Sequence, residues 1–446
     1  MAAVQQTKND IAWEQLFEKY NIKEEIDNKG YFIITSSQIN EFRQARLMTK
    51  FDNQKMLPKL LKDNNLAILP ISGTNYIIGN FQLYKTLPVI NTPIEFMEFP
   101  SQIESIDCNK INSETIALNC AHISKIIDNF LNEENKNIGI LPTVAGKMSS
   151  GQFEFKVDSS TDESFYTVSV DRTGIEIDAG YETDESLVLI EAKNVIADDF
   201  LVRQLYYPYR LWKEKVKKKV RTIFMQYHNG IFSLYEYEFK EPNKYNSLEL
   251  VKSKRYSIVS PEEMKITEQE ILDIFKNIKI VDEPEVPFPQ ANSFDRVISL
   301  LEMLNTDTIK SKEEITEEFE FDPRQTDYYF NAGKYLGFLE ETKIVVEEAG
   351  KDVEKPAITL TSRGKNLFNV SHKNRQLEYV KAILEHSVFC KKINEYKQSK
   401  ITKENLIQLM KESDLYNLKS DVTIKRRAST VQRWIEWIIN LYEAKQ

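Results

Sequence analysis

The sequence predicts an α/β protein with a mixed central sheet, followed by a helical C-terminal region. An amphipathic helix at 113–132 precedes a group of strand-like runs, and a second helix at 197–217 separates them from two further strands. The strand-like runs are 152–157, 164–170, 174–178, 186–192, 221–227 and 231–239. The turn signal His228-Asn229-Gly230 joins the last two as a hairpin.

Length and composition exclude several classes of protein. At roughly 100–200 residues per domain, the 446 residues make two to four domains, and 41 % hydrophobic residues exclude wholesale disorder. The longest apolar runs, such as 66–71, are too short to cross a bilayer, and no signal pattern opens the chain. The spacing of the three cysteines fits neither a disulfide framework nor a zinc site. We expect a cytoplasmic protein without membrane contact.

The chain divides into five segments. Residues 1–112 alternate short helical and strand-like pieces, with a helix at 39–48, and are expected to form an N-terminal α+β accessory region. Residues 113–245 hold the predicted α/β core. Residues 246–290 are expected to be a proline-bearing connector with one helix at 261–276.

The last two segments are predicted to be mainly helical. Within 291–370, three helices are followed by two strand-like runs, which is the layout of a winged helix-turn-helix. Asp322 and Pro323 are expected to start its third helix, and Gly337 to end it. Residues 371–446 repeat a three-helix theme and are expected to form a second, winged-helix-like DNA-binding domain. The expected helices are 294–304, 312–319, 323–336, 375–389, 402–412 and 429–443, and the strand-like runs are 338–346 and 357–361.

The charge is uneven along an acidic chain. Lys and Arg number 59 against 68 Asp and Glu, so the net charge is −9, whereas proteins that coat nucleic acid are usually basic. Residues 203–221 carry eight basic residues and one acidic residue, and residues 372–446 carry fifteen and nine. Such local excess suits contact with a polyanion over a limited face, although a solvated helix surface would look the same.

One constellation carries chemistry. Asp178 ends one apolar strand, and Glu191 and Lys193 stand near the end of the next. Residues i and i+2 of a strand face the same side, so Glu191 and Lys193 project together, and a neighbouring strand can bring Asp178 beside them. Two carboxylates form an oxygen site for Mg²⁺, and a lysine beside them can align a water for phosphodiester hydrolysis. An acid-x-base triplet is common by chance, and the alternative is a half-exposed strand end with a surface ion pair.

The arrangement Asp178…Glu191-Ala192-Lys193 resembles the signature of the PD-(D/E)xK nucleases, and the chain looks most like their type II restriction endonucleases. Residues 146–155, 178–182 and 204–210 add to the resemblance, which covers about residues 113–240 well and the N-terminal region loosely. Two positions depart from the family pattern. Ile177 stands where many members have proline, and Pro208 stands where a Gln-x-x-x-Tyr motif would place its tyrosine.

The resemblance implies a fold and a catalytic role for each residue. The fold would be a restriction-endonuclease-like core with winged-helix modules at its C-terminal side. Asp178 and Glu191, with the Ala192 carbonyl, would bind Mg²⁺, and Lys193 would align the attacking water. Cleavage would leave a 5′-phosphate and a 3′-hydroxyl. Possible supporting residues are Glu114, Glu176 and Gln204.

Candidate DNA contacts lie on both sides of the core. In the third helix of the predicted winged-helix module, Arg324, Gln325 and Asn331 are of the types that pair with base edges, unless this module only mediates protein contacts. Near the C-terminus, Ser429-Thr430 are expected to cap a helix. The DNA contacts expected there are Lys425, Arg426, Arg427, Gln432 and Arg433. Further candidates for phosphate contact are Lys147, Ser149, Ser150, Arg210, Arg43, Arg46 and Lys50.

These observations predict a Mg²⁺-dependent, site-specific endonuclease for double-stranded DNA, part of a restriction system. Cutting two strands needs two active sites, so we expect a homodimer. A companion methyltransferase is expected as a functional partner, but not as a stable one. The alternatives are a winged-helix DNA-binding regulator with an inactive nuclease-like domain, and a nuclease for modified or structured nucleic acid, including RNA.

Overall fold

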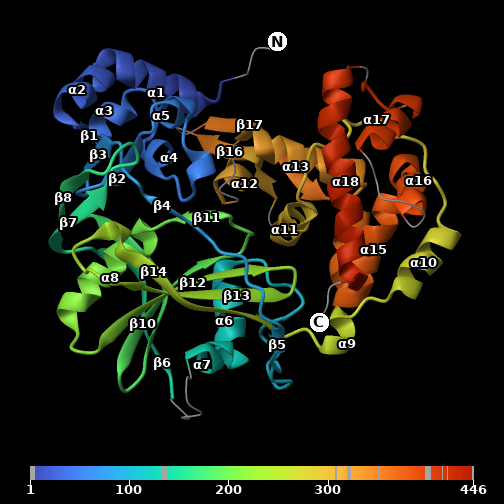
Figure 1. The fold of residues 1–446 in the computed structure, drawn as a ribbon, viewed down its shortest axis with the longest axis horizontal. Helices are drawn as coiled ribbons and strands as arrows, with labels where there is room; N and C mark the ends of the chain where they lie inside the picture. Colours follow the sequence, from blue (N-terminus) through green and yellow to red (C-terminus); the bar gives the residue numbers. More distant parts are fainter. Residues whose placement is uncertain are drawn as a thin grey trace.

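The computed structural model describes residues 6–131, 139–306, 309–318, 323–348, 351–396, 403–413, 415–418 and 420–443. Figure 1 shows an N-terminal region (6–79, blue), a central region around the largest sheet (80–257, mainly green) and a mainly helical C-terminal region (258–443, yellow to red). Among these residues, no helix combines the length and the apolar character that a membrane crossing requires.

The N-terminal region packs short helices around an antiparallel sheet of order β1-β3-β2. Its elements are α1 (Lys8–Lys19), α2 (Ile22–Lys29), β1 (Tyr31–Thr35), α3 (Ser36–Asn40), α4 (Ala45–Thr49), a 3-10 turn (Gln54–Met56), α5 (Lys59–Asp63), β2 (Ala67–Pro70) and β3 (Asn75–Gly79). The single helix predicted at 39–48 is wrong. Helix α3 ends at Asn40, and α4 begins at Ala45. The Asn40 side chain accepts a hydrogen bond from the Ala45 N–H at 2.7 Å and so satisfies the first backbone donor of α4.

The mixed central sheet that the sequence predicts is confirmed. Its seven strands have the order β5-β14-β13-β12-β10-β9-β6, with β10 parallel to β12, β14 parallel to β5, and the other pairs antiparallel. The strands are β5 (Ile94–Phe96), β6 (Leu141–Ser149), β9 (Gly174–Glu182), β10 (Ser186–Lys193), β12 (Lys219–His228), β13 (Ile231–Phe239) and β14 (Leu248–Ser257).

Helices and a small sheet cover the two faces of this sheet. One apolar cluster joins Leu187 and Leu189 of β10 to α8 (Arg203–Lys215) and to the separate two-stranded sheet of β7 (Gln152–Asp158) and β8 (Phe165–Asp171). The alternate residues Val188 and Ile190 belong to a cluster with α6 (Glu114–Ile123) and α7 (Ile126–Leu131). Strand β10 is therefore buried on both faces, as a central strand with a parallel partner should be.

Several predicted elements of the central region are corrected. The runs at 152–157 and 164–170 belong to the small sheet of β7 and β8, not to the central sheet. The predicted helix at 113–132 is broken between α6 and α7, where Lys125 has φ of +64°. The predicted helix at 197–217 begins only at Arg203, because β11 (Asp199–Leu201) pairs with β4 (Tyr84–Thr86).

Three strands of the central sheet, the short β5 and the longer β6 and β14, escaped the sequence analysis. Most side chains of β6 are exposed, so this edge strand lacks an apolar pattern. Strand β14 lies inside 246–290, where we expected a connector, and its exposed and half-buried polar residues hide it. It is hydrogen-bonded to β13 along most of its length.

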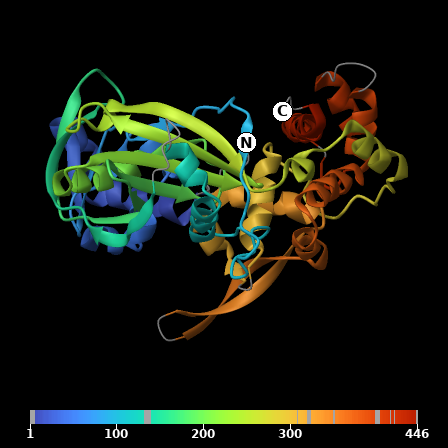
Figure 2. The ribbon, with the colours of Figure 1, turned by 90° about the horizontal axis from the view of Figure 1, so that it is seen from below.

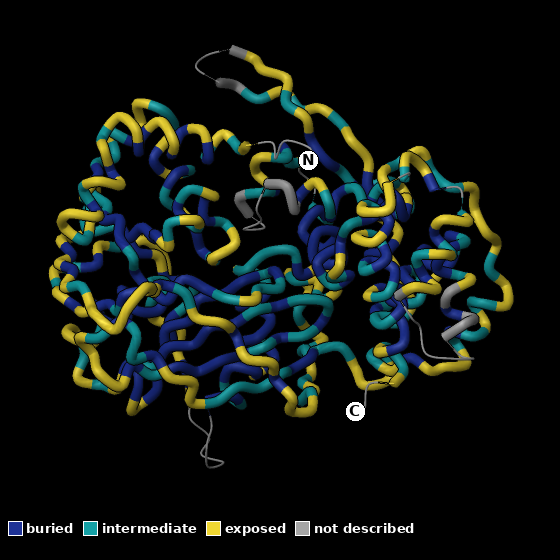
Figure 3. Tube along the Cα trace, turned by 45° about the horizontal axis from the view of Figure 1, so that its top comes forward, coloured by how far each residue is buried: buried dark blue, intermediate teal, exposed yellow. Residues whose placement is uncertain are grey.

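The C-terminal region is a helical body with a projecting arm. Strands β16 and β17 pair from Leu339↔Leu360 to Glu348↔Lys351, and Figure 2 shows them extending away from the body. Figure 3 shows that much of this arm is exposed. The elements are α9 (Pro261–Met264), α10 (Glu268–Asn277), α11 (Phe294–Leu304), β15 (Lys310–Ser311), α12 (Lys312–Glu318), α13 (Pro323–Tyr335), β16 (Leu339–Glu348), β17 (Lys351–Leu360), α14 (Ser362–Asn366), a 3-10 turn (Leu367–Asn369), α15 (His372–Leu384), α16 (Ser387–Tyr396), α17 (Lys403–Glu412) and α18 (Asp421–Glu443).

The ends of the C-terminal helices agree only in part with prediction. Gly337 follows α13 with φ of +75°, as expected for a glycine that ends a helix, whereas Asp322 lies outside the described residues. The predicted cap at Ser429-Thr430 is wrong, because α18 already begins at Asp421. Thr430 is buried inside α18, where its hydroxyl contacts Asn292 at 2.9 Å. The expected helices at 261–276 and 375–389 are each divided in two.

A polar contact fastens the β12–β13 turn to the C-terminal region. The Asn229 side chain exchanges two hydrogen bonds with the amide of Gln376, at 2.6 and 3.3 Å. Its backbone N–H donates to Glu302 at 3.1 Å, and its carbonyl lies 3.2 Å from His372 Nε2. Because Gln376, Glu302 and His372 are buried, all of these contacts are shielded from water.

We expect Asn229→Gly to lower the free energy of unfolding by about 1–3 kcal/mol, because the buried Gln376 amide loses both of its hydrogen bonds to the Asn229 side chain. Asn229 has φ of +47°, which glycine tolerates, so this change removes the side chain without straining the backbone. Urea denaturation followed by circular dichroism measures the loss. The control is Asn417→Gly, at an exposed residue with φ of +53°. Equal stability of the two variants would contradict a role for the Asn229 side chain.

Candidate active site

Asp178 is fixed at the point where two strands separate. The ladder between β9 and β10 ends at Ala179↔Ile190. Immediately beyond it, the Ala192 backbone N–H donates to Asp178 Oδ2 at 2.8 Å. The Asp178 carboxylate thus accepts a hydrogen bond from the β10 backbone where the backbone pairing with β9 stops. This bond holds Asp178 beside Glu191 and Lys193.

Glu191 and Lys193 lie together on the face of β10 that α8 covers. Only 8 % of Glu191 and 7 % of Lys193 is exposed, and Lys193 Nζ is 3.1 Å from Glu191 Oε1. Gln204 of α8 donates from Nε2 to the same oxygen at 2.5 Å. The expected shared face is confirmed, and the alternative of an exposed strand end is wrong.

Glu114 reaches the same cluster from the first turn of α6. Ser113 caps this helix, its hydroxyl accepting from the Ile116 N–H at 3.3 Å. The cap starts α6 so that Glu114 Oε1 lies 3.9 Å from Lys193 Nζ. The structure therefore brings Glu114, Gln204, Asp178, Glu191 and Lys193 together from four elements.

The N-terminal region adds two charged residues. Asp52 is buried and its carboxylate lies 3.4 Å from Lys50 Nζ. Both are close enough to the cluster for their charges to act on the carboxyl groups of Glu114, Asp178 or Glu191. Sequence reasoning offered Lys50 only as a phosphate contact and missed Asp52, because a lone aspartate after a short helix carries no motif.

Burial dominates the protonation of the carboxyl groups. It raises the pKa of Glu191 well above the ordinary value of 4.5; the Lys193 ammonium opposes this rise, and the Asp178 and Glu114 carboxylates add to it. Burial also raises the pKa of Asp178, against the Ala192 N–H and Lys193, and the pKa of Glu114, against Lys193. These groups therefore hold protons more tightly than in the unfolded chain.

The donor set suits a divalent cation in chemistry and charge. Mg²⁺ prefers oxygen ligands and binds through one or two carboxylates while keeping several waters. The carboxyl groups of Asp52, Glu114, Asp178 and Glu191 outnumber the ammonium groups of the two lysines, so the ionised cluster carries excess negative charge. Among the described residues, however, no three or more His, Cys, Asp or Glu side chains are grouped to hold a metal ion. The set that the resemblance implies is smaller, namely two carboxylates and the Ala192 carbonyl.

Glu176 and Pro208 border the cluster. A cavity of only about 10 Å³ is lined by both, together with Glu191 and Gln204. Glu176 is exposed and stands opposite Lys147 in the β6–β9 ladder. Pro208 thus lies near Gln204, at the position where the Gln-x-x-x-Tyr motif would have its tyrosine.

The candidate phosphate contacts of the central region differ in accessibility. Arg210 is buried, where it donates from Nη1 to the Glu154 carbonyl at 2.9 Å and to the Tyr206 hydroxyl at 3.0 Å. Ser150 is buried too. Their positions give both a structural role, and we leave them out of a DNA surface. Lys147 and Ser149 are exposed on β6.

Part of the basic run at 203–221 is compensated by acidic neighbours. Lys218, Lys219 and Arg221 form ion pairs at 2.8, 3.1 and 2.6 Å with glutamates of the central sheet. Three further lysines of the run are exposed: Lys213, Lys215 and Lys217.

The C-terminal candidates are also only partly accessible. Lys425 and Arg426 are exposed on α18, whereas burial lowers the pKa of Arg427. Gln432 and Arg433 both bond to Glu436, at 2.9 and 3.1 Å. On α13, Asn331 is half-buried. The side chains of Arg324 and Gln325 lie outside the described part of the chain.

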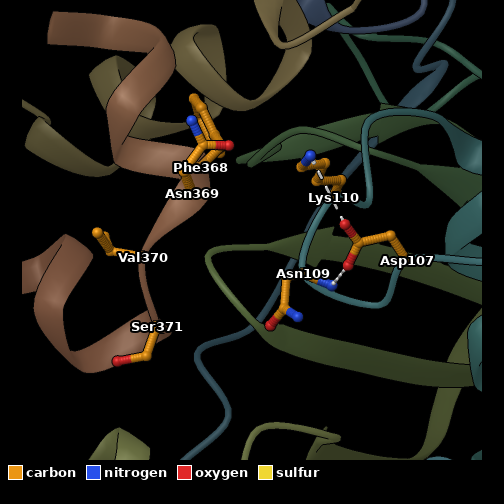
Figure 4. Close-up of a pocket in the computed structure, with 7 residues that line it drawn as sticks. All are labelled: Asp107, Asn109, Lys110, Phe368, Asn369, Val370 and Ser371. Carbon is orange, nitrogen blue, oxygen red and sulfur yellow. Dashed lines mark hydrogen bonds and ion pairs between the residues drawn. The ribbon is translucent and has the colours of Figure 1, made fainter.

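A second hollow lies between the central and C-terminal regions. It has a volume of about 450 Å³, and Figure 4 shows Asp107, Asn109 and Lys110 on one side, with residues 368–371 on the other. Lys110 and Asp107 form an ion pair at 3.8 Å. None of the residues lining this hollow belongs to the Asp178 cluster.

Three protein-family models match consecutive parts of the chain, and each is described as a domain of unknown function. They are DUF6996 over residues 10–78, DUF6997 over residues 79–257 and DUF7226 over residues 296–443. No curated protein and no solved structure matches the chain. The matched segments follow the three regions of the fold, and the cluster draws on the first two of them.

We expect Mg²⁺ to bind more tightly as pH rises above the ordinary carboxyl range, because the cation must displace protons that the raised pKa values of Glu191 and Asp178 retain. At 100 times its dissociation constant, it should stabilise the fold by about 2.7 kcal/mol. Thermal unfolding across pH measures this, and calorimetry in two buffers of different ionisation enthalpy counts the released protons. Glu191→Gln should lose the effect and the exposed Glu185→Gln should keep it. Binding that strengthens at low pH would contradict the assignment.

Proposed function

We propose that the protein is a Mg²⁺-dependent endonuclease for double-stranded DNA, related to the PD-(D/E)xK restriction endonucleases. The observation that carries this proposal is the cluster that joins Asp178, in the middle of β9, to Glu191 and Lys193 at the end of the neighbouring strand β10. In this cluster, Ala192 N–H orients Asp178 and Gln204 orients Glu191.

The order of elements around the cluster supports the proposal. Helices α6 and α7 precede β6, β9 and β10, which form an antiparallel meander interrupted only by the β7–β8 hairpin. Helix α8 then leads to β12, which pairs with β10 in parallel, from Ser186↔Lys219 to Lys193↔Gln226. A helix, three antiparallel strands, a crossover helix and a parallel strand is the core that the resemblance implies.

Each residue would have a distinct task in hydrolysis. Asp178, Glu191 and the Ala192 carbonyl would hold Mg²⁺, which when bound polarises the phosphate and acidifies a water. Lys193 would hold the attacking water in line with the bond to the 3′ oxygen. Breaking that bond leaves the phosphate on the 5′ end, while the 3′ oxygen departs and takes up a proton. Gln204 would keep Glu191 oriented.

The C-terminal region is proposed to supply recognition through winged-helix modules. Its elements α11, β15, α12, α13, β16 and β17 follow the order of that fold, and β15 joins the wing in a sheet of order β15-β17-β16. The wing itself carries more acidic than basic residues, which disfavours contact with phosphates. We therefore place the DNA contact of this region on α18, around Lys425 and Arg426.

Two further proposals concern partners and substrate. Cleavage of both strands needs two copies of the cluster, so we propose that the chain acts as a homodimer on DNA, with a companion methyltransferase protecting the host sequence. The second candidate function is a DNA-binding regulator with an inactive core, which the helix and wing order of the C-terminal region favours. A nuclease for modified or structured nucleic acid would use the same cluster.

The purified chain is expected to cut unmethylated phage DNA into discrete fragments in about 10 mM Mg²⁺, a concentration that suits a weak oxygen site. It should cut nothing in EDTA. Lys193→Ala and Glu191→Gln should lower the cleavage rate by at least about 100-fold, since each removes a group that acts on the reacting atoms. The matched control is Glu185→Gln, on the exposed β9–β10 turn, which should cleave normally.

The pattern of products distinguishes the alternatives. A smear instead of bands would indicate a relaxed or structure-directed nuclease. Binding without cleavage on unmethylated, methylated, structured and RNA substrates would overturn the catalytic proposal and favour the regulator.

The double substitution Lys425→Ala with Arg426→Ala should weaken binding to all duplexes alike. The logarithm of the binding constant falls as the logarithm of the salt concentration rises, and each phosphate contact contributes roughly 0.9 to the steepness of this fall. Losing two contacts should therefore make the fall less steep by about 1.8. Fluorescence anisotropy across salt concentrations measures this. The control is the double substitution Lys381→Ala with Lys391→Ala, which removes two exposed lysines from α15 and α16. An unchanged slope would remove α18 from the proposed interface.

A further inference from the structure

The segment 50–52 of the N-terminal region is fastened to the central region next to the cluster. The Asp52 carbonyl accepts from the Leu201 N–H at 2.8 Å, and the Phe51 carbonyl accepts from the Tyr84 hydroxyl at 2.9 Å. Leu201 ends β11, directly before the helix that carries Gln204. A further contact joins the Gln54 N–H to Asp199 Oδ1 at 2.9 Å. The segment is therefore held at the strand that leads into α8.

The two charged residues of this segment differ sharply in exposure. The Asp52 side chain is 1 % exposed and the Lys50 side chain is 61 % exposed, with 3.4 Å between the carboxylate and Nζ. The carboxylate thus restrains one end of an ion pair whose ammonium stands at the surface. Two of the three donors of that ammonium remain for another anion.

Lys50 is also the accessible cation of the cluster. Lys193 is buried and paired with Glu191, whereas the Lys50 side chain is exposed to an anion in solvent. The charge of Lys50 reaches the carboxyl groups of Asp178 and Glu114, where it opposes the rise in pKa that burial causes. A polyanion needs such a cation beside a cluster that is otherwise rich in carboxylates.

We propose that the N-terminal region completes the active site: Lys50 contacts a DNA phosphate next to the one that is cut, and Asp52 positions Lys50. This inference rests on the proposed nuclease function and names a part of its substrate-binding surface. It assigns the N-terminal region to the site itself, whereas the catalytic residues that the resemblance implies all lie in the central region.

The test combines cleavage with binding in the full chain. Lys50→Gln should raise KM on the order of fivefold, leave kcat within about twofold, and lower the slope of log K against log salt by about 0.9. Asp52→Asn keeps the charge of Lys50 but releases its position, so the slope should persist while kcat/KM falls. The control is Lys59→Gln, because Lys59 is 65 % exposed and pairs with Asp63 as Lys50 pairs with Asp52.

The outcomes separate this inference from the nuclease proposal. If Lys50→Gln keeps the wild-type KM and salt slope while Lys193→Ala is inactive, the inference fails and the nuclease proposal stands. If the wild-type chain cuts nothing, the salt slope of duplex binding in EDTA still decides whether Lys50 contacts a phosphate. A chain that neither cuts nor binds DNA overturns both.

Discussion

The geometry of the candidate site depends on a glutamate and a lysine that are buried at the end of an apolar strand. All eight residues of β10 are buried, including Glu191 and Lys193. Buried charges are tolerated only when they are paired and hydrogen-bonded, because their desolvation is costly. The 3.1 Å contact between the two residues supplies the pairing, and Gln204 supplies a further hydrogen bond. Removing a neighbour of this pair therefore leaves a buried charge less compensated.

This requirement explains why distant elements converge on β10. A parallel partner for β10 needs a long crossover, and residues 194–218 provide it between β10 and β12. The crossover carries α8 with Gln204, and it also carries β11, which pairs with β4 and holds Asp52 in place. On the other side of β10, the cap at Ser113 aims the first turn of α6 at Lys193. The crossover between β10 and β12 thus supplies Gln204 to the cluster and also attaches the N-terminal region to the central region.

Sequence reasoning found the parts of this arrangement that have local patterns. Strand periodicity placed Glu191 and Lys193 correctly on one face at the end of an apolar strand. The strand that was expected to end at Asp178 runs on to Glu182, so that expected strand end is wrong. Strands β6 and β14 remained hidden because their side chains are largely exposed and polar. The roles of Asp52 and Asn229 could not be predicted, because they come from contacts with residues far along the chain. Asp52 contacts Leu201, and Asn229 contacts Gln376. Arg210 looked like a surface cation, yet its guanidinium is buried by aromatic rings.

The departure at Pro208 bears on where the substrate is held. Gln204 and Pro208 are four residues apart on α8, and both border the small cavity beside Glu191. The motif that the sequence resemblance implies would place a phenol at position 208, whereas proline offers no polar atom there. The Gln204 Oε1 atom accordingly has no hydrogen-bond partner among the described residues. In the proposed complex, α8 would supply one polar contact where the motif supplies two, so a second group near the phosphate would come from another element. We propose that the segment 50–52, through Lys50, provides it.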